Sequence, residues 1–483
     1  MTGVHFLGIG GVGMAGVAFL LKARGRAVSG CDLSSSPRTR WLEANGISVA
    51  IGHSPSHITD STTTSATLPA ADIGELVITP AVPPDNPELV TARAAGLTVR
   101  SRGEVLASLV NAADGIAVCG THGKTTTATF TTRLLQNLGA SPSWCIGGET
   151  GTVPVAGVGT GPTQTGTVPT ILGAGPLVVE ADESDGTLAL YRPRTLVLNA
   201  VDFDHLEHFG SKEDYFDCYR TIIRQTTDTI IVCADHPQAL ELVDGVCPPE
   251  AAGRSIPQVV TFGFAPEAQV NAADWPDIPV LGRHNVANAL AAIAVALTRG
   301  FTREQIGAAL PDAVATLPDR RFEQIAEADG VRVYTDYAHH PAELKCAIDM
   351  ARALHPARLR VLFQPHRYSR TKALRDEFPP AFTAADEVVL APVYAAFEEP
   401  IPGGDITDLY AAFRGQTPHV RGQTPHVTLA PSLDEGWQHL FSTARPGDIL
   451  MLLGAGDIIN LVPRVKNEMA KRGAVATTPP PCP

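Results

Sequence analysis

The sequence predicts an α/β protein of three domains, in which parallel sheets are covered by helices. Its 483 residues correspond to about three domains of roughly 150 residues each. Apolar runs typical of buried strands alternate with segments of helical periodicity, and this alternation favours parallel sheets. Two of the apolar runs lead directly into glycine-rich loops. We expect boundaries near residues 113 and 316, which divide the chain into 1–112, 113–315 and 316–483.

The composition is that of a packed protein, with 44% hydrophobic and 18% charged residues. The chain has 37 Lys and Arg against 50 Asp and Glu, and its net charge of −13 argues against sequence-independent binding of nucleic acid. We find no basic region before an apolar stretch at the N-terminus and no run of about 18 apolar residues, so we expect neither a secretory signal nor a membrane span. The eight cysteines include no C-x-x-C pair, which favours reduced thiols in the cytoplasm.

The first domain begins with an apolar run over residues 4–7, followed by a glycine loop and a helical pattern over 12–24. The loop matches G-x-G-x-x-G, and its glycines are Gly8, Gly10, Gly11 and Gly13. Such a loop lets backbone N–H groups approach a diphosphate at a helix N-terminus. Asp32 ends the next strand-like run, where a carboxylate can accept a hydrogen bond from a ribose hydroxyl. The pattern predicts a bound nucleotide, but it fits NAD, a nucleotide sugar or a plain tight turn.

The second domain opens with the apolar run 115–119, a second glycine loop and a helical pattern over about 124–138. The loop reads GTHGKTTT over residues 120–127, with two residues rather than four between its glycines. In a phosphate loop of this kind, backbone N–H groups and Lys124 hold a triphosphate, and the hydroxyl of Thr125 reaches Mg²⁺. Because the loop lies between a buried strand and a helix, it predicts ATP binding.

Carboxylates follow the apolar run 177–179, in the segment EADESD over residues 180–185. The carboxyl ends of strands are where α/β sheets bind ligands. A second polar pair, Asp204-His205, follows the apolar run 196–199. Thr125, Glu180 and His205 are therefore candidate Mg²⁺ ligands. The alternative is that the acidic run is a solvated loop.

The segment GRHNVAN, residues 282–288, opens an apolar helix over 289–297. The amides of Asn285 and Asn288 suit an adenine edge, although Asn near a helix start is also an ordinary cap. In the third domain we expect strands at 331–335, 359–363, 387–391 and 449–453, with a helix over 342–354.

A run of cations lies in this third domain. Residues 350–375 contain seven Lys or Arg and neither Asp nor Glu. A solvated helix face is the usual explanation of such a run. Arg367 and Arg370, however, follow the expected strand 359–363 at a ligand-binding edge, and a guanidinium binds carboxylates bidentately.

Taken in order, the segments GTHGKTTT, EADES, DH, GRHNVAN, RRF and DYAHHP resemble the Mur ligases, which are ATP-dependent amide-forming enzymes of peptidoglycan precursor synthesis. The segments HFLGIGGVGMAG, FQPHRYSRT, VYAAFEEPIPG and LLGAGDI extend the resemblance over about residues 4–460. It implies an N-terminal Rossmann-like domain for a UDP-sugar, a central P-loop ATPase-type domain and a C-terminal Rossmann-like domain that brings the amino acid. The first glycine loop then holds a UDP diphosphate, and the NAD interpretation is dropped.

The resemblance also implies an activity. We expect ligation of L-alanine to the lactoyl carboxylate of UDP-N-acetylmuramic acid through an acyl phosphate, with ATP and Mg²⁺ as cofactors and with ADP and phosphate as products. The nearest alternative is a ligase that adds a recycled tripeptide to the same sugar. Folylpolyglutamate synthesis and a nucleotide-binding module without catalysis are more distant. The expected setting is the cytoplasm, in cell wall biogenesis, cell shape and cell division, and the expected state is a monomer or homodimer.

The resemblance finally implies roles for single residues. The catalytic residues would be Lys124, Arg321, His339 and His366, with one histidine as the base. ATP would be bound by Gly120, Thr121, His122, Gly123, Lys124, Thr125, Thr126, Asn285, Asn288, Arg321 and Asp336. The sugar nucleotide and alanine would contact Gly8, Gly10, Gly11, Gly13, Asp32, Arg102, Glu183, Ser184, Tyr337, His339, His366, Arg367 and Arg370. The metal would be held by Thr125, Glu180 and His205.

Overall fold

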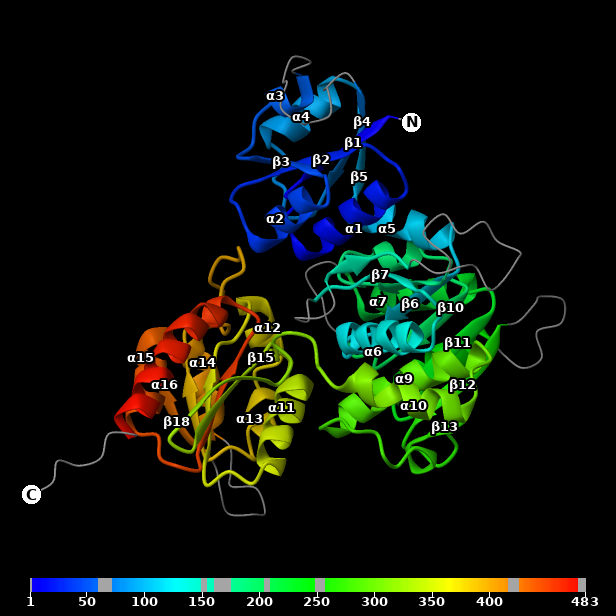
Figure 1. Cartoon of the computed structure of the whole chain (residues 1–483). Helices are drawn as coiled ribbons and strands as arrows, with labels where there is room; N and C mark the ends of the chain where they lie inside the picture. Colours follow the sequence, from blue (N-terminus) through cyan, green and yellow to red (C-terminus); the bar gives the residue numbers. More distant parts are fainter. Residues whose placement is uncertain are drawn as a thin grey trace, which may run out of the picture. The chain divides into compact units, whose positions relative to one another are not determined.

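The computed structural model describes residues 2–59, 72–148, 154–159, 175–203, 209–247, 257–415 and 425–476 (Figure 1). The chain divides into two compact units, Met1–Pro318 and Asp319–Pro483. The strands form three sheets, two in the first unit and one in the second. The predicted α/β class is therefore confirmed.

The first sheet has the order β3-β2-β1-β4-β5, and its strand pairs are all parallel. The strands are β1 (Gly3–Leu7), β2 (Val28–Asp32), β3 (Ser48–Ile51), β4 (Ile73–Ile78) and β5 (Thr98–Ser101). Val4 and Phe6 pack against α1 (Val12–Ala23) and α5 (Arg102–Asn111). On the opposite face, Leu7 and Cys31 pack against α3 (Ser56–Thr59) and α4 (Pro87–Ala94), while α2 (Pro37–Ala44) follows β2. Helices thus cover both faces of this sheet.

The second sheet has the order β13-β12-β11-β10-β6-β9-β7-β8 and is parallel except for the pair β7–β8. Its strands are β6 (Gly115–Cys119), β7 (Ser143–Cys145), β8 (Ala156–Gly157), β9 (Leu177–Glu180), β10 (Thr195–Leu198), β11 (Thr229–Cys233), β12 (Gln258–Gly263) and β13 (Val270–Asn271). The strands expected from the apolar runs 115–119, 177–179 and 196–199 are present, and the antiparallel pair was not predicted.

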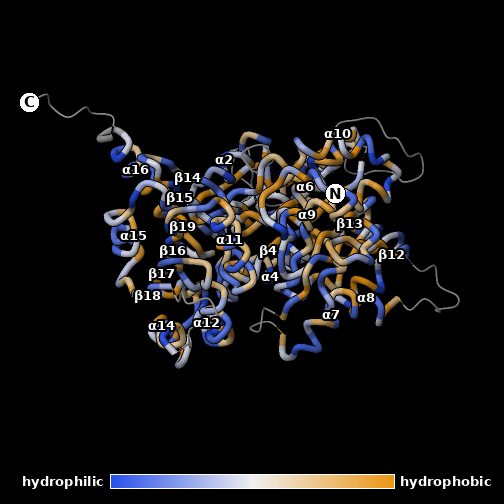
Figure 2. Tube along the Cα trace, turned by 90° about the horizontal axis from the view of Figure 1, so that it is seen from below, coloured by the Kyte–Doolittle hydropathy of each residue, from blue (hydrophilic) through white to orange (hydrophobic). Residues whose placement is uncertain are grey.

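Helices cover both faces of the second sheet. One face packs against α6 (Lys124–Asn137) and α9 (Arg283–Thr298), with α10 (Arg303–Val314) beside them. Much of α9 is hydrophobic, as its orange trace in Figure 2 indicates. The other face packs against α7 (Lys212–Gln225) and α8 (Pro237–Val246). The short 3-10 helices η2 (Thr187–Leu190) and η3 (Ala272–Asp274) complete this part of the chain.

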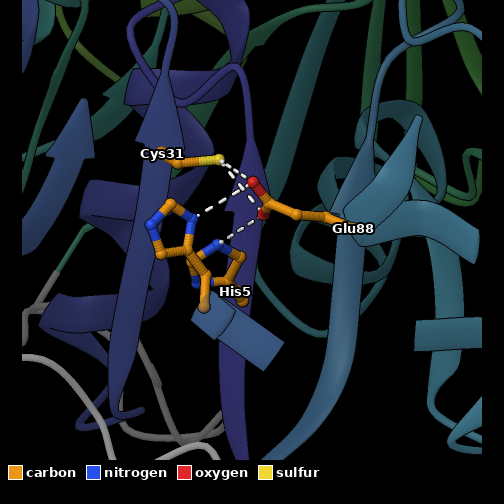
Figure 3. A group of neighbouring side chains, drawn as sticks. His5, Cys31 and Glu88 are labelled. Carbon is orange, nitrogen blue, oxygen red and sulfur yellow. Dashed lines mark hydrogen bonds and ion pairs between the residues drawn. The ribbon is translucent and has the colours of Figure 1, made fainter. Parts of the chain in front are cut away.

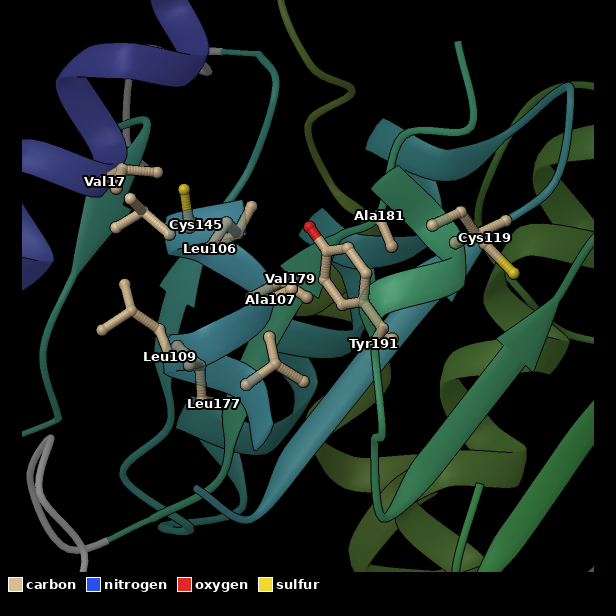
Figure 4. Packing of buried hydrophobic residues seen from close by; sticks show 14 of the residues in the cluster. Val17, Leu106, Ala107, Leu109, Cys119, Cys145, Leu177, Val179, Ala181 and Tyr191 are labelled. Atoms are coloured by element: carbon tan, nitrogen blue, oxygen red, sulfur yellow. The ribbon is translucent and has the colours of Figure 1, made fainter. Parts of the chain in front are cut away.

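The first two sheets share one hydrophobic core. Figure 4 shows Val17 of α1 and Leu106 and Leu109 of α5 close to Cys145 of β7 and Leu177 of β9. All five side chains are buried in the same cluster. Helices α1 and α5 are therefore packed on the second sheet, which carries the second glycine loop.

The third sheet has the order β14-β15-β19-β16-β17-β18, in which only the hairpin β14–β15 is antiparallel among the strands described. Its strands are β14 (Glu323–Ala328), β15 (Val331–Asp336), β16 (Leu359–Phe363), β17 (Glu387–Leu390), β18 (His426–Leu429) and β19 (Ile449–Leu453). Its helices are α11 (Pro341–Ala353), α12 (Tyr368–Ala373), α13 (Phe378–Ala381), α14 (Ile406–Gly415), α15 (Leu433–Ser442), η4 (Asp457–Leu461) and α16 (Val462–Ala476). Two hydrophobic clusters lie on its two faces.

The lengths and hydropathy of the helices bear on whether any of them could span a membrane. Among the residues that it describes, no helix combines the length and apolar character needed to cross a bilayer.

Candidate active site

The second glycine loop connects buried β6 to the N-terminus of α6. Gly123 takes the N-cap position with a φ of 80°, in the left-handed region that glycine adopts most easily. A Cβ at this position would lie 2.6 Å from Oδ1 of Asn288, so the close packing of α9 also requires glycine here. The loop is therefore shaped to turn tightly into a helix N-terminus, where anions bind.

Lys124 is the first residue of α6 and forms a buried ion pair. Its Nζ lies 2.9 Å from both carboxylate oxygens of Glu183 and donates to the carbonyl oxygen of Gly120 at 2.7 Å. Burial lowers the pKa of Lys124, but the carboxylates of Glu183, Asp182 and Glu180 together outweigh burial, and the pKa is raised. Lys124, predicted to bind ATP, and Glu183, predicted to contact the sugar nucleotide or alanine, thus fix each other's position. The ammonium is positioned beside the phosphate loop.

Two of the three predicted metal ligands lie together. Oγ1 of Thr125 donates to both oxygens of Glu180, at 2.9 and 3.0 Å, and the N–H of Gly147 donates to the same carboxylate at 2.7 Å. A hydroxyl and a carboxylate are hard oxygen ligands of the kind that Mg²⁺ prefers. His205, the third predicted ligand, lies outside the described residues, as does Asp204.

Sequence reasoning missed a histidine–carboxylate cluster beside the loop. Asp202 lies 3.1 Å from Nε2 of His122 and 3.3 Å from Nε2 of His236. The close approach of these two imidazoles holds the pKa of Asp202 far below its usual range. The hydroxyl of Thr121 also exchanges hydrogen bonds with the backbone of Asp202, both at 2.8 Å. The only available signal was the position of Asp202 just after β10.

The predicted adenine ligands lie inside α9 rather than before it. Gly282 takes the N-cap position, so the alternative that Asn285 or Asn288 caps the helix is wrong. Oδ1 of Asn288 accepts a hydrogen bond from Thr127 at 3.0 Å, and Asn199, a residue that the sequence did not single out, donates to the same hydroxyl at 3.0 Å. These buried amides fix α6 against α9 and β10 directly behind the loop.

The first glycine loop is held by two side chains from the strand and helix that follow it. Oδ2 of Asp32 accepts from the N–H of Gly10 at 2.9 Å, and Nε of Arg38, which sequence reasoning missed, donates to the carbonyl of Gly10 at 2.7 Å. A Cβ at Gly13 would lie 2.7 Å from Nη1 of Arg102. Arg102 therefore lies directly against the loop.

Arg102 also connects the first loop to the acidic segment of the second sheet. Its Nη2 lies 3.5 Å from Oδ2 of Asp182 and 4.0 Å from Oδ2 of Asp185. Oγ of Ser184 donates to the Asp182 carboxylate at 2.9 Å. The acidic segment is thus not simply a solvated loop, because Glu180, Glu183 and Asp182 each contact a candidate site residue.

In the second unit, the residues predicted to line the amino-acid site form an aromatic and imidazole cluster. The ring centroids of His339 and His366 are 5.7 Å apart, and Tyr337 lies 5.3 Å from His339. Nη1 of Arg370 lies 3.3 Å from Nδ1 of His366. The Tyr394 ring, which the sequence did not single out, stacks on His366 at 5.4 Å.

Charged residues surround this cluster. The Arg321 guanidinium lies 5.0 Å from the Tyr337 ring centroid, and Nη1 of Arg367 lies 3.7 Å from Oε1 of Glu398, another residue that was missed. Asp336 is buried and accepts from the N–H groups of Phe322 and Ala338, each at 2.7 Å. Burial raises the pKa of Asp336 to about 6, against the opposing effects of Arg321 and these two N–H groups.

The cation run contains both structural and candidate functional residues. Arg352 pairs with Asp386 at 2.8 Å, Arg358 pairs with Asp448 at 2.6 Å, and buried Arg360 pairs with Glu387. A solvated helix face is therefore the wrong explanation for this part of the run. Arg367 and Arg370 differ from these residues because they lie at the imidazole cluster.

Comparisons with known proteins match nearly the whole chain. Three family models match in succession: "Mur ligase family, catalytic domain" at residues 3–114, "Mur ligase middle domain" at 118–296 and "Mur ligase, glutamate ligase domain" at 320–456. The UDP-N-acetylmuramate–L-alanine ligase of Thermobifida fusca is 37% identical and the match covers 96% of this chain and 95% of that protein.

Two solved structures match over nearly their full length. The crystal structure of a UDP-N-acetylmuramate–alanine ligase from Thermotoga maritima has a TM-score of 0.70 and 26% identity, covering 99% of this chain and 100% of that one. A murein peptide ligase from Psychrobacter arcticus has a TM-score of 0.64 and covers 96% of this chain and 98% of that one, but its 23% identity indicates a shared fold alone.

Proposed function

The chain belongs to the Mur ligase family, and from this premise we propose that it joins L-alanine to the lactoyl carboxylate of UDP-N-acetylmuramic acid with conversion of ATP to ADP and phosphate. Near-full-length similarity to ligases named for this reaction favours L-alanine over a recycled tripeptide. The observation that carries the proposal is the phosphate loop, in which Lys124 is held by Glu183 and Thr125 contacts Glu180. This arrangement suits an ATP-dependent ligase rather than a dehydrogenase.

Each third of the chain takes one substrate in this proposal. Residues 1–112 bind the UDP-sugar, with the first glycine loop around the diphosphate and Asp32 near the ribose. Residues 113–315 bind ATP, and residues 316–483 bring the amino acid. Arg102 supports the first assignment, because it lies against Gly13 and carries the positive charge that a diphosphate needs.

The first chemical step is phosphoryl transfer. An oxygen of the lactoyl carboxylate attacks the γ-phosphorus, and the bond between that phosphorus and the bridging oxygen of ADP breaks. Lys124 and Arg321 stabilise the negative charge on the transferring group. Thr125, Glu180 and His205 would hold Mg²⁺, which would supply further neutralisation of this charge. Asn285, Asn288 and Asp336 position the nucleoside of ATP.

The second step forms the amide. The neutral amine of L-alanine attacks the acyl carbon, and the bond to phosphate breaks. The amine proton passes to a histidine, because imidazole accepts protons near neutral pH. We assign this role to His339 rather than His366. Glu343 lies 3.3 Å from Nδ1 of His339 and stabilises its imidazolium, whereas the cationic Arg370 lies beside His366. Arg367 and Arg370 bind the alanine or lactoyl carboxylate.

An oxygen-isotope experiment tests the acyl phosphate. With ¹⁸O in the lactoyl carboxylate, the proposal expects one labelled oxygen in the released phosphate, because that oxygen leaves with phosphorus when the amide forms. Unlabelled phosphate would contradict an acyl phosphate.

The reaction belongs in the cytoplasm, where ATP and nucleotide sugars occur, and serves cell wall biogenesis and with it cell shape and division.

Substitution of Lys124 tests the division of labour between the domains. Lys124→Ala is expected to abolish ADP formation while calorimetry still measures binding of the UDP-sugar, because the first glycine loop does not include Lys124. Simultaneous loss of catalysis and UDP-sugar binding in a folded variant would contradict the assignment.

A further inference from the structure

Four potential metal ligands converge on the α3–α4 face of the first sheet (Figure 3). They are His5 of β1, Cys31 of β2, His57 of α3 and Glu88 of α4. Each offers one ligand atom, and all of these atoms lie within 4.8 Å of one another. His5, Cys31 and Glu88 are buried, and Figure 3 shows their side chains pointing toward one another. The ligase reaction proposed above uses none of them.

The carboxylate of Glu88 is crowded with more neighbours than hydrogen bonding explains. Its Oε1 lies 2.8 Å from the N–H of Ser54, 3.1 Å from Nδ1 of His57, and 3.3 Å from both Nδ1 of His53 and Sγ of Cys31. A carboxylate oxygen has about two lone-pair positions, so it cannot accept well from all four groups. A cation between the carboxylate, the imidazoles and the sulfur resolves this crowding.

His5 is oriented as a metal-bound histidine usually is. Its Nδ1 is hydrogen-bonded to Oγ of Ser29 at 2.9 Å, which leaves Nε2 directed at the cluster, 3.4 Å from Oε2 of Glu88. This Nε2 is buried and has no hydrogen bond of acceptable geometry among the described residues. Histidines that bind metals commonly have the other ring nitrogen held by a second partner. Ser29 and Ser54 thus act as the outer contacts of the site.

We propose that His5, Cys31, His57 and Glu88 bind a divalent transition metal, of which Zn²⁺ fits best. Sulfur and nitrogen ligands select zinc over magnesium, and zinc favours four tetrahedral ligands. Metal–ligand distances of about 2.0–2.3 Å place tetrahedral ligands about 3.3–3.8 Å apart. The separations of Glu88 from Cys31, His57 and His5 are 3.3, 3.1 and 3.4 Å, so small side-chain movements complete the geometry.

The charges in the cluster also match a divalent cation. Burial, together with the neighbouring Glu88 carboxylate, raises the pKa of the Cys31 thiol. With the thiolate and the Glu88 carboxylate as ligands, the two positive charges of Zn²⁺ are neutralised.

The metal would stabilise the strand end that supports the first glycine loop. The carbonyl oxygen of Cys31 accepts from the N–H groups of Gly8 and Ile9, at 2.8 and 2.9 Å. Asp32, the next residue, holds the N–H of Gly10. The two helices that supply His57 and Glu88 have only four and eight residues. A cation joining them to β1 and β2 would fix this edge of the sheet.

Metal analysis of the full-length chain tests the proposal. The protein is prepared without a polyhistidine tag, stripped with a chelator and titrated with Zn²⁺ or Co²⁺ in the presence of excess Mg²⁺. We expect one tightly bound Zn²⁺ per chain, and a Co²⁺ form with a thiolate-to-cobalt charge-transfer band. That band reports a Cys–metal bond independently of ligase activity. Its absence from the stoichiometric Co²⁺ protein, or a failure to bind either metal, would overturn the proposal.

Two variants and a control assign the ligands. Cys31→Ser is expected to lose the charge-transfer band, whereas Cys346→Ser, which alters a half-buried thiol of the second unit, is expected to keep it. His57→Gln changes a side chain that is 21% exposed and should fold normally, and its zinc affinity is expected to fall at least about tenfold. A band that persists in Cys31→Ser, or unchanged affinity in His57→Gln, would place the metal elsewhere.

Discussion

The buried ion pair of Lys124 and Glu183 predicts that stability and activity can be separated at the phosphate loop. Lys124→Met keeps the length of the side chain but removes the ammonium that lies 2.9 Å from both Glu183 oxygens. At this distance and an effective dielectric constant of about 20, two unit charges attract by about 6 kcal/mol. Part of this attraction offsets desolvation of the two charges. Removing one partner of a buried pair accordingly lowers the free energy of unfolding by about 3–5 kcal/mol.

Removal of both charges should restore most of the stability. In Lys124→Met/Glu183→Gln no uncompensated charge is buried, and neutral replacements of buried pairs are often tolerated. Lys345→Met is the matched control, because the pair of Lys345 with Asp349 is 62% and 51% exposed. We expect this control to lie within about 0.5 kcal/mol of the wild type.

Urea unfolding followed by circular dichroism measures these stabilities, and ADP release measures turnover. The double variant is expected to recover stability without recovering ADP formation, because no cation remains at position 124 to stabilise the transferring phosphoryl group. The reasoning would be refuted if Lys124→Met were as stable as Lys345→Met. A double variant that forms ADP at the wild-type rate would refute the role of Lys124 in phosphoryl transfer.

Three further predictions concern the other parts of the site. Glu180→Gln is expected to raise the Mg²⁺ concentration for half-maximal activity at least about tenfold, because it removes the carboxylate that Thr125 contacts; an unchanged Mg²⁺ titration would contradict this. Arg102→Ala is expected to raise KM for the UDP-sugar about 10-fold or more with a smaller change in kcat, and the reverse pattern in steady-state kinetics would contradict it. Burial raises the pKa of Asp336 from its usual 3.8 to about 6 in the folded chain. As pH rises from 4 to 6, the carboxyl group ionises in the unfolded chain while it stays protonated in the folded one, so the free energy of unfolding of the wild type falls by about 3 kcal/mol. Asp336→Asn has no proton to lose at this position and does not show this fall. The advantage of Asp336→Asn in urea unfolding should therefore grow as pH rises from 4 to 6 and then level off, and a pH-independent difference would refute it.

The central strands could be predicted from the sequence because buried parallel strands are continuous apolar runs. Residues 115–119 and 449–453 are fully buried in their sheets, as their composition indicated. The outer strands of the two antiparallel pairs, β14 and β8, were missed because their sequences contain no continuous apolar run. Strand β14 (Glu323–Ala328) reads EQIAEA, with exposed and half-buried positions along most of its length, and β8 (Ala156–Gly157) has two residues.

The candidate site was predictable where chemistry is local in the sequence. Lys124 and Thr125 follow a glycine loop, and Glu180 ends a buried strand, so spacing alone placed them. Asp202 and His236 were not predictable, because Asp202 meets His122 and His236 only through the parallel registers of β10 with β6 and with β11. Charge patterns were equally ambiguous. The sequence could not distinguish the structural Arg360 from Arg370 at the imidazole cluster.

The most direct test of the proposed function is ADP release by the full-length chain with UDP-N-acetylmuramic acid, ATP and Mg²⁺, assayed in parallel with single amino acids and with a tripeptide. We predict rapid ADP release with L-alanine, formation of the corresponding amide by mass spectrometry, and little turnover with the tripeptide or without the sugar nucleotide. Turnover that prefers the tripeptide, or ADP release that is independent of UDP-N-acetylmuramic acid, would contradict the proposed function.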